Sequence, residues 1–245
     1  MTKKFIAHIT VNGTVLPVEV VQEPRNGHRY SVTRKRIGMR IPMKASEADV
    51  QKHLRDLEAR VAQWAAKRTA LLAPFIPKQY RSGDVLQVGT RQYVLDILEE
   101  DRGSHTGKLV GNTLALRLST RSTPAGRTKA IKTLLSRIVA GDYQTEIEQR
   151  VLAWNRRTFN RPIKGVFLKY NHSNWGSCSH NGNINLSTRL LFAPEPVQDY
   201  VILHELAHLV ELNHSDRFWK LVENFMPDYA SREKWLSKYG GTCDF

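Results

Sequence analysis

The stretch Val201–Leu209, with the sequence VILHELAHL, decides how this chain is interpreted. It places His204, Glu205 and His208 in the pattern H-E-x-x-H among apolar residues. Residues four positions apart lie one above the other on a helix, so both imidazoles can face the same point. Two histidines so placed can bind one Zn²⁺, and the glutamate can reach a water on the metal without binding the metal itself. The stretch therefore predicts a buried helix that carries part of a zinc site.

A catalytic zinc usually has three protein ligands and one position open to water. His214 is the leading candidate for the third ligand, because Asn213 tolerates the left-handed backbone that would end the helix and turn the chain back. Glu211 and Glu223 are the alternatives. A metzincin would have glycine where Glu211 stands, so the chain is not a metzincin.

These parts predict a hydrolase that holds one zinc per chain. Zinc lowers the pKa of its bound water toward neutrality. Glu205 would take the proton as the hydroxide attacks a carbonyl, and would return it to the leaving amine. The strand expected at Asn183–Leu186 could offer an edge to an extended peptide, or it could be purely structural. A separate group should stabilise the oxyanion, and the sequence offers four candidates: His172, Asn174, Tyr229 and Tyr239.

The 245 residues carry a formal net charge of +14, and this charge is unevenly distributed. Residues 1–101 hold 17 basic and 11 acidic residues, whereas residues 195–245 hold 5 and 9. Residues 102–194 hold 15 basic and only 3 acidic residues, a net charge of +12. Such a segment indicates either a polyanionic partner, most simply nucleic acid, or a solubilising surface.

Cysteine content and hydropathy exclude several classes of protein. Cys178 and Cys243 are the only cysteines, too few for a disulfide scaffold or a four-cysteine zinc site. No apolar run approaches the roughly 18–20 residues of a membrane-spanning helix. The basic N-terminus is not followed by the apolar stretch of a secretory signal. We therefore expect a cytoplasmic protein with no membrane partner, and the sequence leaves the oligomeric state open.

The chain is expected to divide into a β-rich region, residues 1–124, and a mixed region, residues 125–245. In the first region, Asn12-Gly13 between two β-branched runs is a strong hairpin signal. Apolar residues at helical spacing predict one helix near residues 46–73. The short polar segment Ser119–Arg127 is the candidate linker. After it the periodicity becomes mainly helical.

A series of short motifs surrounds the H-E-x-x-H stretch. In chain order they are Asn174-Trp175-Gly176-Ser177-Cys178-Ser179, Gly182-Asn183-Ile184-Asn185-Leu186, Pro196, Asp199-Tyr200-Val201, HELAHL (204–209), Asn213-His214-Ser215, Phe218-Trp219 and Pro227-Asp228-Tyr229. This combination, within Lys164–Leu236, resembles the YgjP-like metallopeptidases. That family belongs to the zincins and is similar to the SprT-like and WLM proteases.

The resemblance implies an α+β fold with a zincin-like catalytic domain after a β-rich N-terminal region. It implies His204, His208 and His214 as zinc ligands and Glu205 as catalytic base, in agreement with the reasoning from residue types. The sequence departs from the family at Asn174, where a basic residue is usual, and at Leu186-Ser187-Thr188, where asparagine and an aromatic residue are commoner. These departures leave the metal site untouched and concern substrate recognition.

The motif Trp175–Cys178 allows two interpretations. It could line the cleft, or it could be a tryptophan-anchored turn that packs against the zinc helix, which is the interpretation we favour. Cys178 could be a fourth or inhibitory metal ligand, although a small buried thiol is commoner.

Three functions are compatible with these features. The first is a zinc metallopeptidase, with nucleic-acid-associated proteins as candidate substrates. The second is a metal-dependent nucleotide phosphohydrolase, since positive charge suits a phosphoanhydride, but no phosphate-binding glycine loop is present. The third is a nucleic-acid-binding protein with a structural zinc, although structural zinc sites are usually rich in cysteine. Arg25–Arg40 and Arg150–Lys169 interleave basic and aromatic residues in the manner of a single-strand binder.

Overall fold

The computed structural model describes residues 2–33, 36–67, 72, 75 and 78–245. The chain forms two compact units, Met1–Pro77 (unit 1) and Lys78–Phe245 (unit 2), and each is described here by itself. The sequence pattern placed the division at residues 124/125 instead. The boundary lies earlier because the strands within 85–119 share one hydrophobic core with the helices that follow them.

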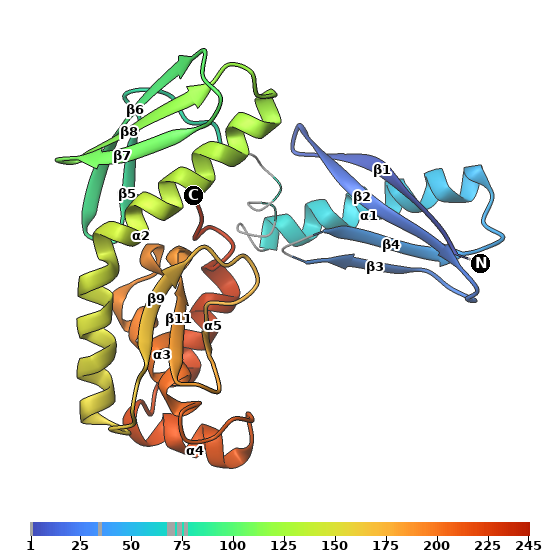
Figure 1. The fold of residues 1–245 in the computed structure, drawn as a ribbon. Coiled ribbons are helices and arrows are strands. Elements are labelled where there is room, and N and C mark those ends of the chain that lie inside the picture. The colour runs from blue at the N-terminus through green and yellow to red at the C-terminus, as the bar shows by residue number, and fades with distance from the viewer. Residues whose placement is uncertain (1, 34–35, 68–71, 73–74, 76–77) are drawn as a thin grey trace. The chain divides into compact units, whose positions relative to one another are not determined.

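Unit 1 is a four-stranded sheet with one helix (Figure 1). Its strands β1 (Lys3–Val11), β2 (Thr14–Glu23), β3 (Arg29–Val32) and β4 (Ile37–Pro42) lie in the order β1-β2-β4-β3. Asn12 and Gly13 join β1 to β2 with φ values of 51° and 76°, which is the turn that an Asn-Gly pair favours.

The helix of unit 1, α1 (Glu47–Lys67), buries one apolar stripe against the sheet. The Ser46 hydroxyl accepts a hydrogen bond from the Asp49 amide, and the Asp49 carboxylate accepts from the Ser46 amide, so the two residues cap the helix start reciprocally. The part of the predicted helix at 68–71 and 73 lies outside the described residues.

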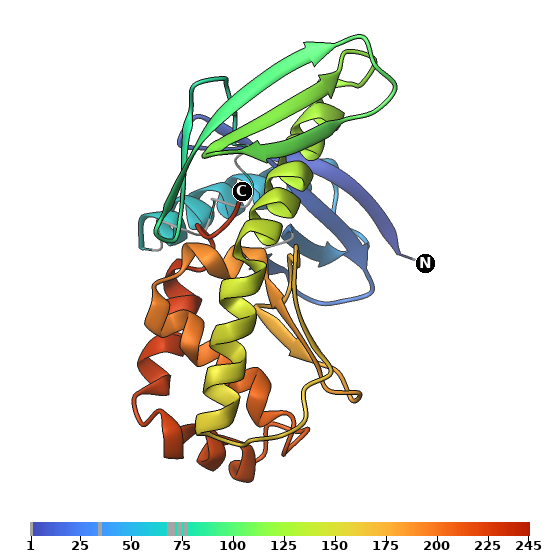
Figure 2. The same ribbon diagram turned by 60° about the vertical axis from the view of Figure 1, so that its left-hand side comes forward.

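Unit 2 begins with a second four-stranded sheet, in the order β5-β6-β8-β7. Its strands are β5 (Val85–Val88), β6 (Arg91–Glu100), β7 (Thr106–Val110) and β8 (Thr113–Ser119). The predicted linker Ser119–Arg127 is too long, because Ser119 is the last residue of β8 and α2 (Pro124–Arg157), capped by the Thr123 side chain, already begins at Pro124. This 34-residue helix runs along both sheets of unit 2, so it ties them together (Figure 2).

The second sheet of unit 2 contains β9 (Gly165–Lys169), β10 (Gly176–Cys178) and β11 (Asn183–Ser187). Their order is β10-β11-β9. Since β11 pairs with β10 on one side and with β9 on the other, it offers no free edge. The expectation that Asn183–Leu186 could bind a peptide by its edge is therefore wrong, and the sheet edge near the predicted site belongs to β10.

The chain then forms a 3₁₀ helix, Thr188–Phe192, and three α-helices: α3 (Glu195–Ala207), α4 (Asp216–Phe225) and α5 (Tyr229–Tyr239). The strands, the long helix α2 and these helices share one core, which completes an α+β zincin-like unit after a β-rich N-terminal region. Within the described residues, no helix is both long and apolar enough to cross a membrane.

Candidate active site

Helix α3 is buried along most of its length and carries the first two histidines. Val201, Ile202 and Leu203 are at most 3% exposed, and Leu206 and Ala207 are fully buried, so the apolar surroundings expected from the sequence are present. The helix ends at Ala207, and His208 is its C-terminal cap. His204 and His208 are half-buried, and Glu205 between them is buried.

The turn after α3 brings His214 back to the other two histidines. One ring nitrogen from each of the three lies within 4.8 Å of the other two, and His204 Nε2 is 3.0 Å from His214 Nε2. Of the described residues, Glu211 and Glu223 do not join this group. The Glu211 carboxylate lies 3.8 Å from Arg217, and Glu223 is exposed on α4.

The three histidines fit a zinc ion. Two nitrogens bound to zinc at 2.0–2.1 Å in tetrahedral geometry are about 3.3 Å apart, close to the observed separation of His204 and His214. The Glu211 carbonyl lies 3.1 Å from His208 Nδ1, an arrangement that fixes the proton there and leaves Nε2 as the ligand atom. Burial, together with the neighbouring His208 and His214, lowers the pKa of His204 to about 3, so its ring is a neutral donor at physiological pH.

Glu205 is a residue of α3, and its side chain packs against the strand β10. A Cβ added to Gly176 would be 2.6 Å from both Cγ and Oε1 of Glu205, so only glycine allows the strand to approach this closely. Burial raises the pKa of Glu205 to about 8, while a hydrogen bond from the Cys178 backbone amide acts in the opposite direction. Trp175–Cys178 therefore packs against the candidate metal helix, as the favoured interpretation expects, and it also contacts the candidate base.

Cys178 is not part of the histidine group in the described chain. Its thiol is partly buried and lies 3.6 Å from the Ser179 carbonyl oxygen. Burial, helped by the negative charge of Glu205, raises the pKa of the thiol to about 11.

Aromatic rings surround the third histidine. Phe218 is fully buried and contacts all three histidine rings at centroid distances of 4.6–4.9 Å. Trp219 stacks on His214 at 5.8 Å, and Tyr229 stacks on Trp219 at 5.3 Å. The sequence identified Phe218-Trp219 only as one of the motifs around the H-E-x-x-H stretch, and their position a few residues after His214 was the available signal.

Of the four candidate oxyanion donors, Tyr229 is connected to the histidines through this stack, because its ring packs on Trp219 and Trp219 packs on His214. His172 packs against Tyr170, Asn174 is exposed, and Tyr239 packs against Trp235.

Arg189 is a buried residue that the sequence reasoning missed. Its side chain is 3% exposed and donates hydrogen bonds of 2.9–3.0 Å to the carbonyls of His172, Gly240 and Cys243. Its guanidinium lies over the Trp175 ring at 4.5 Å. Arg189 thus connects the C-terminal residues to the strand that contacts Glu205. A basic residue within an otherwise apolar stretch, Leu190–Ala193 following it, was the only signal.

Comparison with known proteins agrees with this geometry. The model of the family "YgjP-like, metallopeptidase domain" matches residues 28–239. The fold and the site together define a zincin-like metallopeptidase. The chain belongs to the YgjP-like metallopeptidase family, which confirms the resemblance noted from its motifs and implies a divalent metal and a protein or peptide substrate.

One solved structure is similar over part of the chain. It is the metallopeptidase zymogen abylysin of Pyrococcus abyssi, with 26% identity and a TM-score of 0.34, over 37% of this chain and 91% of that one. A TM-score this low adds nothing to the description of the fold. No curated protein matches the chain.

Proposed function

We propose that the chain is a zinc-dependent peptidase in which His204, His208 and His214 hold one zinc ion and Glu205 is the general base. The observation that carries this proposal is the convergence of three histidine nitrogens within 4.8 Å beside a buried glutamate. A site with three protein ligands and a neighbouring acid is typical of catalytic zinc, whereas structural zinc sites are closed and rich in cysteine.

Each group at the proposed site has a separate role in peptide hydrolysis. Zinc, when bound, would activate water and polarise the peptide carbonyl. Glu205 would take the proton from the attacking water and deliver it to the departing amine nitrogen. Its buried position keeps bulk water away from the carboxylate, and the Cys178 amide fixes its orientation. Tyr229 is the donor we assign to the developing oxyanion, since its ring stacks on Trp219, which in turn stacks on His214.

The test is cleavage of an unfolded protein such as casein by the wild type and by Glu205→Gln. We expect the variant to keep its zinc and to lose activity by about 10²–10⁴-fold, the usual contribution of a general base. Glu211→Gln is the matched control, because Glu211 is close to the same histidines but interacts with His208 through its main chain. A Glu205→Gln variant that still cleaves casein would refute the mechanism.

A parallel assay separates the peptidase from the phosphohydrolase alternative. The same proteins are incubated with nucleoside triphosphates and phosphate release is measured. Release by the wild type that disappears in Glu205→Gln, without casein cleavage by either protein, would assign the site to phosphoanhydrides.

A further inference from the structure

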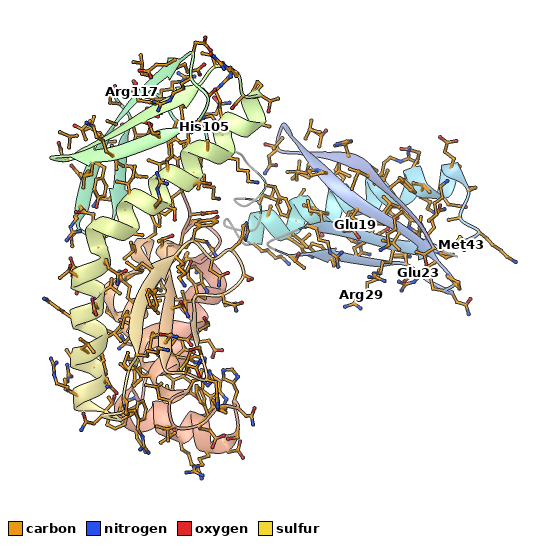
Figure 3. The ribbon with its side chains drawn as sticks, viewed as in Figure 1. Glu19, Glu23, Arg29, Met43, His105 and Arg117 are labelled. Carbon is orange, nitrogen blue, oxygen red and sulfur yellow. The ribbon has the colours of Figure 1, made fainter. Side chains whose placement is uncertain are left out.

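The structure divides the basic segment 102–194 into two parts. In residues 102–137, five of the eight basic side chains pair with acidic residues, and four of these five pair with acids that come just before the segment in the sequence. Arg117 on β8, for example, lies 2.9 Å from Asp96 and 3.7 Å from Glu100 (Figure 3). The other pairs are Arg102–Glu100, Arg121–Asp101, Arg127–Glu99 and Lys132–Asp244.

Unit 1 shows the same neutralisation. Glu19 and Glu23 lie along β2 (Figure 3), where Glu19 pairs with Arg36 and Glu23 pairs with Arg25 and Arg40. The basic residues of Arg25–Arg40 in the described chain are therefore largely matched by acids. This stretch, which also suggested a single-strand binder, offers little free positive charge.

The second part of the segment is different. No acidic residue occurs between Gln149 and Pro194. Five exposed cations and the exposed ring of Phe167 lie within it, at the end of α2, in the loop that follows and on β9. We call this group the basic surface: Arg156, Arg157, Arg161, Lys164, Phe167 and Lys169. Within the described parts of the chain, none of the five cations pairs with an acidic group, unlike Arg150 just before them, which pairs with Asp199.

The basic surface follows the chain from the end of α2 along β9. Arg156 and Arg157 are the last residues of α2, and the next seven residues form the loop. The strand β9 then runs beside the middle of α2, where Gln144 Nε2 donates to the Val166 carbonyl and the Leu168 amide donates to Gln144 Oε1. Lys164 is fixed at the start of β9, because its amide donates to the Gly182 carbonyl at 2.9 Å.

The aromatic member of the surface lies on the exposed face of β9. Val166 and Leu168 point into the core, while Phe167 is 41% exposed and Lys169 beside it is exposed. A Cβ on Gly165 would be 2.9 Å from the Phe167 ring, so the ring lies along the strand over this glycine. Lys169 Nζ is 4.8 Å from the ring centroid. A flat aromatic ring with a cation beside it can stack on a nucleic-acid base while the cation binds a phosphate.

The helix end explains only part of this charge. Basic residues are favoured in the last turn of a helix, where the carbonyl dipoles are negative, and this accounts for Arg156 and Arg157. It does not account for Arg161, Lys164 and Lys169, which lie beyond the helix. Cations gathered without counter-charges repel one another, and a polyanion relieves that repulsion.

We propose that the basic surface binds single-stranded nucleic acid. The five cations would contact phosphates, and Phe167 would stack on a base. An acidic peptide would satisfy the cations but would leave the exposed ring unused, and a duplex would hide the base faces that the ring needs. The inference does not depend on the metal site, so the two proposals can fail separately.

The test is the anisotropy of a fluorescein-labelled deoxythymidine oligonucleotide of about 20 nucleotides, long enough to span one site, titrated with the full chain at several salt concentrations. The variant is Arg156→Gln/Arg161→Gln/Lys164→Gln. The matched control is Lys108→Gln/Lys129→Gln/Arg137→Gln, which removes the same charge from exposed positions elsewhere in the segment. We expect the variant to bind at least about 10-fold more weakly, with the slope of log K against log[salt] reduced by about 2. The control should bind nearly as the wild type does.

Phe167→Leu separates stacking from charge. It leaves the net charge unchanged, and we expect binding about 5–10-fold weaker with an unchanged salt slope. Equal losses in the two triple variants would overturn the proposal, because they would indicate attraction to total charge. Polyglutamate that binds as tightly as the oligonucleotide, or a Phe167→Leu variant with unchanged affinity, would overturn it in favour of an acidic protein partner.

Discussion

The two sides of Glu205 are built in different ways. On one side, His204, His208 and His214 come from a single stretch of eleven residues and converge through helical spacing and one turn. On the other side, β10 pairs with β11, and Trp175 just before β10 lies under Arg189, whose partners Gly240 and Cys243 are more than fifty residues further along the chain. The comparison teaches that metal binding rests on local sequence, whereas the position of the base rests on long-range packing. Changes on the strand side should therefore lower turnover and leave zinc in place.

The largest effect on the strand side is expected for Gly176→Ala. The new methyl would lie 2.6 Å from Glu205, so the carboxylate or the strand must move. A displacement of about 1 Å can cost about 10²-fold in rate, and we expect a loss of kcat of that size at full zinc content. The measurement is casein cleavage together with elemental analysis.

Gly141→Ala is the matched control for this prediction. Gly141 lies in α2, where an added Cβ would meet nothing within 4 Å, so activity should stay at the wild-type level. If Gly176→Ala keeps full activity, or if it loses zinc together with activity, the two sides of Glu205 are not separable in the way described.

A smaller effect is expected for Arg189→Met. The change leaves three buried carbonyls without their donor, at a cost of about 1–3 kcal/mol each, and it removes the cation over Trp175. We expect a clear drop in the unfolding midpoint and, well below that midpoint, a kcat reduced about 10-fold with unchanged KM and zinc.

Arg137→Met serves as the control for Arg189→Met, because Arg137 is exposed on α2. It should change neither stability nor turnover. A lower stability of Arg189→Met with normal kcat would make Arg189 a purely structural residue and would remove it from the positioning of β10.

The smallest effect is expected for Cys178→Ala. The thiol is outside the histidine group of the described chain, and the backbone amide that contacts Glu205 survives the substitution. We expect activity within about 3-fold of the wild type and an unchanged zinc content, because only a small partly buried side chain is altered. A variant with markedly higher activity would instead identify Cys178 as an inhibitory ligand.

The local features of the site could be predicted from the sequence, since helical spacing alone places His204 and His208 on one face of a helix. The α+β fold and the family were also predicted correctly. The close contact of Gly176 with Glu205 could not be predicted, because it depends on which strand packs against α3. The role of Arg189 was equally hidden, since its three acceptors come from separate segments.

The boundary between the two units and the pairing of charged side chains were likewise only partly predictable from the sequence. The periodicity after residue 124 indicated helices but not that one helix, α2, would span two sheets and join residues 85–119 to the catalytic unit. The count of +12 for residues 102–194 treated Arg117 and its neighbours as free, although their partners Asp96–Asp101 lie just before that segment. Folding pairs the charges of Arg117 and its neighbours, whereas none of the cations of the basic surface pairs with an acidic group in the described chain.

The zinc content of the purified protein tests the central claim most directly. Elemental mass spectrometry of the wild type, His214→Ala and Glu211→Gln, all dialysed against the same zinc buffer, compares the proposed third ligand with its main rival. We predict one zinc per chain in the wild type and in Glu211→Gln, and little or none in His214→Ala, since catalytic zinc requires three protein ligands. Full zinc in His214→Ala, or a wild type that takes up none, would contradict the three-histidine site.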